Sequence, residues 1–285
     1  MLNIKKILLP LDLGQTNLPA AVVHEAAALT RHFHSEVLVL HVVEPLTFLA
    51  GSETTQELLE QAVAKEQESL SKSLGPVLDG KPYKRIVVKG DAAREILRIA
   101  RDENIDLIVM PTHGYGAFEK FMLGSVTAKV LHQSTCPVWA GAQVKDVPVG
   151  QFAIRNVLCA VDFSPLSSKA IHWAHEAATE FGAKLTLAHV TPSMEVYGPG
   201  GYHVLTEMKN ELVNSAKAQL NKIKQEMGIP ATAFVGSGNV AKVMGQAAKE
   251  TKADLIVVGS RSIAGRFGDT AYGIIRESPV PVVSI

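Results

Sequence analysis

The sequence has few of the residues that mark specialised protein classes. Only two cysteines, Cys136 and Cys159, occur among 285 residues, and they form no CxxC pair. This argues against both a disulfide framework and a zinc cluster. The 28 basic and 28 acidic residues give a net charge of zero, so the composition predicts no binding to nucleic acid or to an anionic membrane surface.

Long hydrophobic runs are missing as well. No uncharged apolar stretch reaches the roughly 18 residues that a membrane helix needs. Lys5, Lys6 and Asp12 interrupt the apolar start of the chain, which is typical of a strand rather than of a signal peptide. We therefore expect a protein of the reducing cytoplasm.

What the sequence does contain is an internal repeat. Residues 4–13, IKKILLPLDL, match residues 154–163, IRNVLCAVDF, and DLIVMPTHG from Asp106 matches DLIVVGSRS from Asp254. The two copies are offset by about 150 residues, so the chain is predicted to form two domains. We place the first at residues 1–143 and the second at 152–285, joined by a linker without periodicity.

Each half alternates short apolar runs with amphipathic segments, the pattern of βα units around a parallel sheet. In the first half the predicted strands are 7–9, 37–40, 86–88, 107–110 and 138–139, all continuously apolar and so expected to be covered on both faces. Long amphipathic helices are predicted at about 54–74 and 205–227. Ser164 and Pro165 predict the start of another helix, with Ile171, Ala174 and Ala178 on its apolar face.

In such a sheet a ligand binds beyond the carboxyl ends of the strands, where the winding reverses, between strands one and four. Asp12 follows the first strand, where its carboxylate either accepts hydrogen bonds from a ribose or caps a turn. The fourth strand is followed by Gly114 and Gly116 and then by Gly124 and Ser125, which open a helix. Glycines before a helix N-terminus are suited to phosphate, and Ser125 and Thr127 add hydroxyl donors.

These elements together resemble the universal stress protein family. The residues that carry the resemblance are Pro10-x-Asp12, Leu40-His41-Val42 and Gly114-x9-Gly124-Ser125, and the resemblance extends over both halves. It implies two Rossmann-like domains of the adenine nucleotide alpha hydrolase-like type, each a five-stranded parallel sheet of order 3-2-1-4-5 with helices on both faces. It also implies a nucleotide site formed by Pro10, Asp12, Val42, Met110, Gly114, Gly124, Ser125, Val126 and Thr127.

In that site Asp12 and the backbone of Val42 would contact the adenosine part, with Met110 beside the base and the residues from Gly114 to Thr127 on the phosphates. One residue departs from the family pattern, because Pro111 stands where the family has a glycine. Proline lacks an N–H donor, and its ring takes up space beside the ribose.

The second copy departs further. Gly259 keeps the first glycine, but Ser262 replaces the second, and only five residues separate it from Gly268 instead of nine. Asp269 then stands where the first copy has Ser125, and a carboxylate at a helix start repels phosphate. The C-terminal half is therefore predicted not to bind ATP in the family manner, although Arg261 and Arg266 leave a smaller anion open.

The resemblance implies a cytoplasmic regulatory protein of the stress response that binds ATP or another adenine nucleotide, with or without Mg²⁺, and is not an enzyme. Two alternatives stay open: a weak ATPase or nucleotidyl transferase that uses the same cleft, and a scaffold with two empty sites. The chain lacks the GxxxxGK[ST] loop of many ATPases. Family members commonly pair through their last strands, so we expect residues 280–285 to join the two halves within one chain. The sequence leaves open whether two chains also form a homodimer.

Other residues are assigned plainer roles. His172 and His175 lie at helical spacing but are too few for a zinc site, and His41 and His189 are expected to pack at strand ends. His113, in the glycine loop, is the histidine best placed for function. The cysteines are expected to be inert, and residues 198–203 to form a glycine-rich loop.

Overall fold

The structure is a computed structural model, and it describes residues 2–12, 20–43, 83–112, 123–141, 153–193, 201–259 and 269–285, with the backbone alone for 201–206 and 269. The N-terminal half contains β1 (Lys6–Pro10), α1 (Ala20–Phe33), β2 (Glu36–Val43), β3 (Lys84–Lys89), α3 (Ala92–Asp102), β4 (Leu107–Pro111), α4 (Ser125–Gln133) and β5 (Val138–Gly141). The C-terminal half contains β6 (Asn156–Ala160), α5 (Ser167–Phe181), β7 (Lys184–Thr191), α6 (Gly201–Met227), β8 (Thr232–Ser237), α7 (Val240–Glu250), β9 (Leu255–Val258), α8 (Asp269–Glu277) and β10 (Val282–Ser284).

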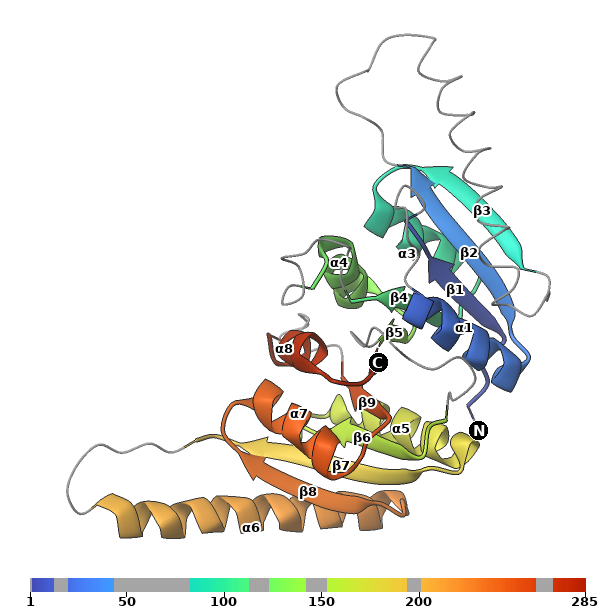
Figure 1. Cartoon of the computed structure of the whole chain (residues 1–285). Coiled ribbons are helices and arrows are strands. Elements are labelled where there is room, and N and C mark those ends of the chain that lie inside the picture. The colour runs from blue at the N-terminus through green and yellow to red at the C-terminus, as the bar shows by residue number, and fades with distance from the viewer. Residues whose placement is uncertain are drawn as a thin grey trace, which may run out of the picture.

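The strands form one ten-stranded sheet in the order β3-β2-β1-β4-β5-β10-β9-β6-β7-β8 (Figure 1). Each half therefore has the predicted order 3-2-1-4-5, and within each half every pair of neighbours is parallel. The halves meet where β5 and β10 pair antiparallel, with Trp139 opposite Val283. The predicted α/β architecture is confirmed.

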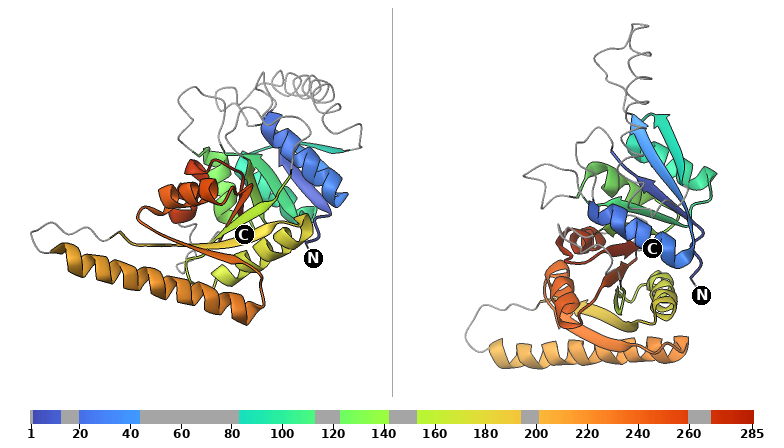
Figure 2. Two further views of the ribbon diagram at one scale, coloured as in Figure 1. Left: turned by 60° about the horizontal axis from the view of Figure 1, so that its bottom comes forward. Right: turned by 45° about the vertical axis from the view of Figure 1, so that its right-hand side comes forward.

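Helices cover both faces of the sheet, which is why its inner strands are apolar throughout. Successive strand residues point to opposite faces: Ile7 and Leu9 belong to the apolar cluster that includes α1 and α5, whereas Leu8 belongs to the cluster that includes α3, α4, α7 and α8. The views in Figure 2 show the two halves side by side, with α6 along the outer edge of the C-terminal half. The core is thus two apolar layers, one on each face of the sheet.

The N-terminal half contains a buried polar pair that the periodicity does not reveal. The indole Nε1 of Trp139 donates to Oε2 of Glu25 at 2.8 Å, and the two residues are only 1% and 3% exposed. Val283, the register partner of Trp139, is fully buried and has an apolar side chain. A polar contact therefore holds α1 to β5, whereas β10 is held by apolar packing.

Two helix starts differ from the prediction. Helix α5 begins at Ser167 and not at Pro165, because the main chain at Ser164 is held in a turn by the carboxylate of Asp162 and the preceding Phe163 is left-handed, with φ of 61°. Helix α6 begins at Gly201, so the last part of the expected 198–203 loop is helical. The helix expected at 54–74 lies outside the described residues.

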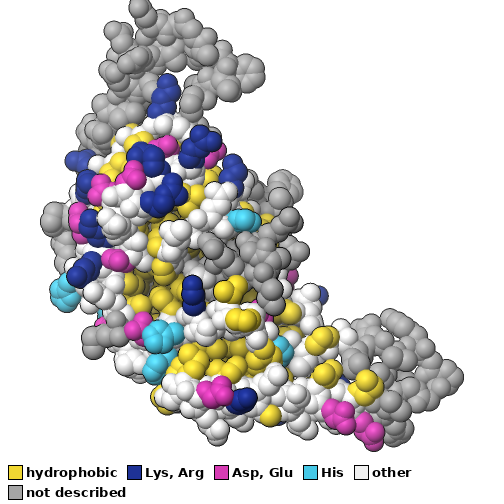
Figure 3. Space-filling view, turned by 180° about the vertical axis from the view of Figure 1, so that it is seen from behind, with side chains coloured by type: hydrophobic (Ala, Val, Ile, Leu, Met, Phe, Trp, Pro, Cys, Tyr) yellow, Lys and Arg dark blue, Asp and Glu magenta, His cyan; other side chains and the backbone are white. Residues whose placement is uncertain are grey.

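The surfaces of the two halves also differ. Seen from behind in Figure 3, charged side chains crowd the N-terminal half. In the same half, Arg98 of α3 forms ion pairs with Glu95 and Asp102. Hydrophobic side chains gather instead over the C-terminal half. Within the described part of the chain, no helix combines the length and the apolar character needed to cross a bilayer.

Candidate functional site

The sequence predicts a ligand crevice at the carboxyl ends of β1 and β4. These strands are neighbours, with Ile7 opposite Leu107 and Leu8 opposite Ile108. After β1 the chain leads to α1 on one face of the sheet, and after β4 it leads to α4 on the other face. The two connections therefore diverge at the carboxyl ends of these strands. Asp12 follows β1 and is exposed at the opening.

The start of α4 has the properties of an anion site. Gly124 is the N-cap and provides no side-chain hydrogen bond, while its own N–H donates to the carbonyl of Thr112 at 2.9 Å. Among the described residues we find no acceptor for the main-chain N–H groups of Ser125, Val126 and Thr127. These donors lie at the positive end of the helix dipole and are suited to an anion.

The hydroxyl of Thr127 is engaged elsewhere. It donates to the carbonyl of Pro111 at 2.9 Å, and the residue is 4% exposed. The expected role of this side chain as a phosphate donor is therefore corrected: the hydroxyl ties α4 to the end of β4. Ser125 is exposed, so its hydroxyl is accessible at the helix start.

The other predicted residues line the ends of the strands. Pro10 is the last residue of β1 and is paired with Leu40, and Met110 and Pro111 end β4 beside β5. The side chain of Met110 is 3% exposed, while Val42 is half-buried. The structure thus brings Pro10, Asp12, Val42, Met110 and the start of α4 to one end of the sheet, whereas Gly114 and His113 lie outside the described residues.

His41 has a positioning role that the sequence did not suggest. Its Nδ1 donates to the carbonyl of Leu11 at 3.0 Å, immediately before Asp12, and the residue is 5% exposed. His189 repeats this contact in the second half, with Nδ1 at 2.7 Å from the carbonyl of Val161. Each histidine therefore fixes the backbone that carries the aspartate at its crevice. The recurrence of the histidine and the aspartate at equivalent strand ends of both halves was the available signal.

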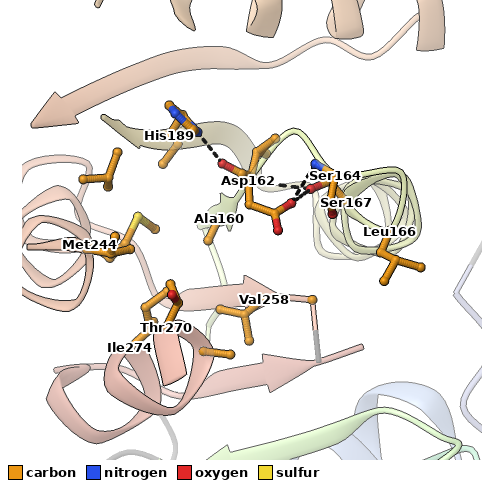
Figure 4. A pocket seen from close by; sticks show the side chains of 16 residues that line it. Ala160, Asp162, Ser164, Leu166, Ser167, His189, Met244, Val258, Thr270 and Ile274 are labelled. Atoms are coloured by element: carbon orange, nitrogen blue, oxygen red, sulfur yellow. Dashed lines mark hydrogen bonds between the residues drawn. The ribbon is translucent and has the colours of Figure 1, made fainter. Parts of the chain in front are cut away.

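The two aspartates differ in their surroundings. The amide of Ser164 donates to Oδ1 of Asp162 at 2.9 Å, and the hydroxyl of Ser167 donates to the same oxygen, at the side of a cavity at the carboxyl ends of β6, β7 and β9 (Figure 4). Partial burial raises the pKa of Asp162, but the hydrogen bonds from Ser167 and Ser164 outweigh it, so the pKa lies below its usual value. This carboxylate is therefore ionised at neutral pH.

The remaining candidates have structural roles. Cys159 is buried in β6, and burial raises the pKa of its thiol to about 12. Burial also raises the pKa of Cys136. His172 is exposed beside Glu176 at 4.0 Å, and the described residues contain no group of three or more metal-ligating side chains.

The sequence is similar to those of known proteins. The sequence profile of the universal stress protein family matches residues 3–140 and again 153–285. Two universal stress proteins of Methanocaldococcus jannaschii are 34% and 31% identical over 154 and 137 residues; each match covers 47% of this chain and 92% or 79% of the relative.

One solved structure covers almost the whole chain and has the same fold. The crystal structure of a universal stress protein from Archaeoglobus fulgidus is 24% identical, with a TM-score of 0.69 over 99% of this chain and 96% of that one. A universal stress protein solved in complex with cAMP is 25% identical and covers 46% of this chain and 95% of that one, with a TM-score of 0.32.

Proposed function

The chain belongs to the universal stress protein family, and from this premise we propose that its N-terminal half is an adenine-nucleotide site of a regulatory protein. The observation that carries the proposal is the start of α4, where three adjacent N–H groups have no acceptor among the described residues. Backbone donors in this arrangement suit a phosphate better than a neutral ligand.

The residues at the strand ends fit the rest of a nucleotide. In this proposal Asp12 binds the ribose, Val42 and Met110 lie beside the base, and Gly114, Gly124, Ser125, Val126 and Thr127 surround the phosphates. The main-chain N–H groups of Ser125, Val126 and Thr127 are the donors, and Gly124 lets the phosphates approach without a Cβ. Pro10 shapes the turn before Asp12. ATP, with or without Mg²⁺, is the expected ligand, and the neighbouring Pro111 ring, which adds no donor, is expected to lower its affinity.

We further propose that the domains span 1–143 and 152–285, and that the second does not bind ATP. Helix α8 begins with Asp269, whose carboxylate opposes a phosphate at the equivalent helix start. The protein acts in the cytoplasm through nucleotide-dependent contacts with a stress-response partner. Pairing of β5 with β10 serves as its internal dimer contact, and two chains associate as a homodimer.

The test compares the two equivalent aspartates. Calorimetric titration with ATP is carried out on the full chain and on Asp12→Ala and Asp162→Ala. We expect the first variant to lower ATP affinity about tenfold, because a charge-assisted hydrogen bond to the sugar is lost, and the second to leave it unchanged. Equal losses in both variants, or no heat with the full chain at millimolar ATP, would contradict the proposal.

A second measurement identifies the natural ligand. Mass spectrometry of the nucleotide released from the purified, heat-denatured protein is expected to find an adenine nucleotide. Incubation with ATP then distinguishes binding from turnover. Phosphate release that Asp12→Ala abolishes would favour an ATPase over a regulatory binding protein.

A further inference from the structure

The pairing of β5 with β10 brings equivalent positions of the two halves face to face. Trp139 and Val283 lie opposite each other at the centre of this antiparallel pairing, with one further register pair on each side. By the internal repeat the two residues are also equivalent, because each is the second residue after the proline that precedes its strand, Pro137 or Pro281. The two halves are therefore related here by an approximate twofold axis.

Equivalent positions also meet where helices α1 and α5 end. Phe33 and Phe181 are the last residues of these helices, and their rings pack edge to face with centroids 5.7 Å apart. The residue before each phenylalanine is His32 in the first half and Glu180 in the second. Nε2 of His32 donates to Oε1 of Glu180 at 3.2 Å. We call the β5–β10 pairing and these two helix ends the seam.

At both places the equivalent residues differ in a complementary way. Trp139 and Val283 are both buried, so a large and a small side chain share the centre of the seam. His32 and Glu180 are a base and an acid in contact. Two equal halves would place indole against indole or valine against valine, and imidazole against imidazole or carboxylate against carboxylate. Two indoles overfill the space, two valines leave a void, and equal charges repel.

We propose that the seam selects its partner: it accepts an N-terminal half against a C-terminal half and rejects two equal halves. The surface that the first half presents at β5 and at the end of α1 then fits the second half of this chain, or of another copy of it, but not the first half of another copy. A homodimer of the chain uses a different surface or exchanges halves. This inference does not depend on nucleotide binding in either half.

The contribution of charge can be tested through pH. Imidazole groups change their charge between about pH 5 and 8, whereas carboxylates and guanidinium groups keep theirs from about pH 6 upward. The charged neighbours of His32 are Glu180 and the two arginines that line the same hollow, Arg31 of α1 and Arg155 before β6. The side chains of His32 and Glu180 are 35% and 22% exposed, so we expect a small effect that is strongest at low salt.

Single substitutions build the seam of equal halves inside one chain. His32→Glu places two carboxylates across the seam, as two C-terminal halves would, and Glu180→His places two imidazoles there. We expect each to lower the melting temperature of the full chain by about 2 °C at about pH 6 and low salt. The reversed pair, His32→Glu with Glu180→His, should recover at least half of this loss, because it restores one base and one acid.

The pH dependence separates charge from packing. At about pH 8.5 the loss caused by Glu180→His should shrink, because two neutral imidazoles do not repel, whereas the loss caused by His32→Glu should remain. His172→Glu is the matched control, because it places a carboxylate beside Glu176 within α5 and not across the seam. Its effect should be the same in the parent and in the reversed pair.

The centre of the seam is tested by the same logic. Val283→Trp places two indoles there and Trp139→Val two valines, and both should lower the urea midpoint. The reversed pair, Trp139→Val with Val283→Trp, should be more stable than Trp139→Val alone. Both of these proteins lack the contact of Trp139 with Glu25, so their comparison isolates the filling of the void.

The charge pair decides the outcome, because its side chains are partly exposed and its variants should all fold. A reversed charge pair that is more stable than both single variants, with the expected pH dependence, supports selection of unlike halves. A reversed charge pair no more stable than His32→Glu would overturn the proposal, whatever the central pair does.

Discussion

In the N-terminal half, α4 begins with Ser125 after a glycine cap and presents main-chain donors, whereas in the C-terminal half α8 begins with Asp269. The residue at the end of the fourth strand of each half differs as well. The first half has Pro111, whereas a Cβ added to Gly259 in the second half would meet no atom of the described residues within 4 Å. A duplicated fold has thus kept its strand order while exchanging the groups around the same point of the sheet. The difference teaches that the fold alone does not determine the ligand.

The largest effect on stability is expected at Trp139 of β5, which faces Val283 of the equivalent strand β10. Trp139→Phe removes the donor to Glu25 and leaves a buried carboxyl group without that partner, which should lower the free energy of unfolding by about 2–4 kcal/mol. Urea denaturation measures it. Glu25→Gln keeps an acceptor oxygen and should cost less; a loss under about 1 kcal/mol for Trp139→Phe would mean that the pair contributes little.

A smaller effect is expected when one half is given the helix start of the other. Ser125→Asp places a carboxylate at the first residue of α4, as in α8, and should lower ATP affinity at least about tenfold by repelling the phosphates. Calorimetry measures the change. Ser125→Ala is the control, because it removes the hydroxyl without adding charge. Equal ATP affinities of the two variants would mean that the phosphates do not bind at the start of α4.

The two halves have equivalent N-caps at helices α3 and α7. Asp91 accepts from the amide of Arg94 at 2.9 Å, and Asn239 accepts from the amide of Lys242 at 3.1 Å at the equivalent place. Asn239→Ala should lower the free energy of unfolding by about 1 kcal/mol. Asp91→Ala should change stability in the same direction, and it also removes the contact with Lys129 of α4 at 3.4 Å. Unchanged melting temperatures in both variants would show that the caps are dispensable.

The sequence was sufficient for the architecture because apolar runs such as 107–110 fit only strands covered on both faces. It did not predict the pair of Trp139 and Glu25, which are 114 positions apart and meet only after folding. It predicted the start of α5 too early. Serine is a common N-cap residue, but in the structure the amide of Ser164 donates to the carboxylate of Asp162 and the chain forms a turn there.

The candidate site was predictable to a similar degree. Local patterns predicted a crevice from the strand ends and a helix start, and Pro10, Asp12, Val42, Met110 and Gly124 lie at the same end of the sheet. Ligand binding there stays a prediction. The engagement of Thr127 with Pro111 was not predictable, because a hydroxyl at a helix start has several acceptors within reach. In the C-terminal half the sequence left only a smaller anion open and did not predict the cavity at the carboxyl ends of β6, β7 and β9, because the loss of phosphate-binding residues gives no information on the volume that remains.

The smallest expected effect concerns the pH dependence of Asp162. Its pKa is lowered in the folded protein, so the unfolded chain binds more protons and the stabilising contribution is complete only above the usual aspartate pKa of about 3.9. As the pH falls below the usual aspartate pKa and through the lower folded pKa this contribution is lost, so in acid the parent should lose stability more steeply than Asp162→Asn, which cannot ionise. Chemical denaturation at several pH values measures both slopes. Parallel slopes would mean that the hydrogen bonds from Ser164 and Ser167 do not favour the ionised form.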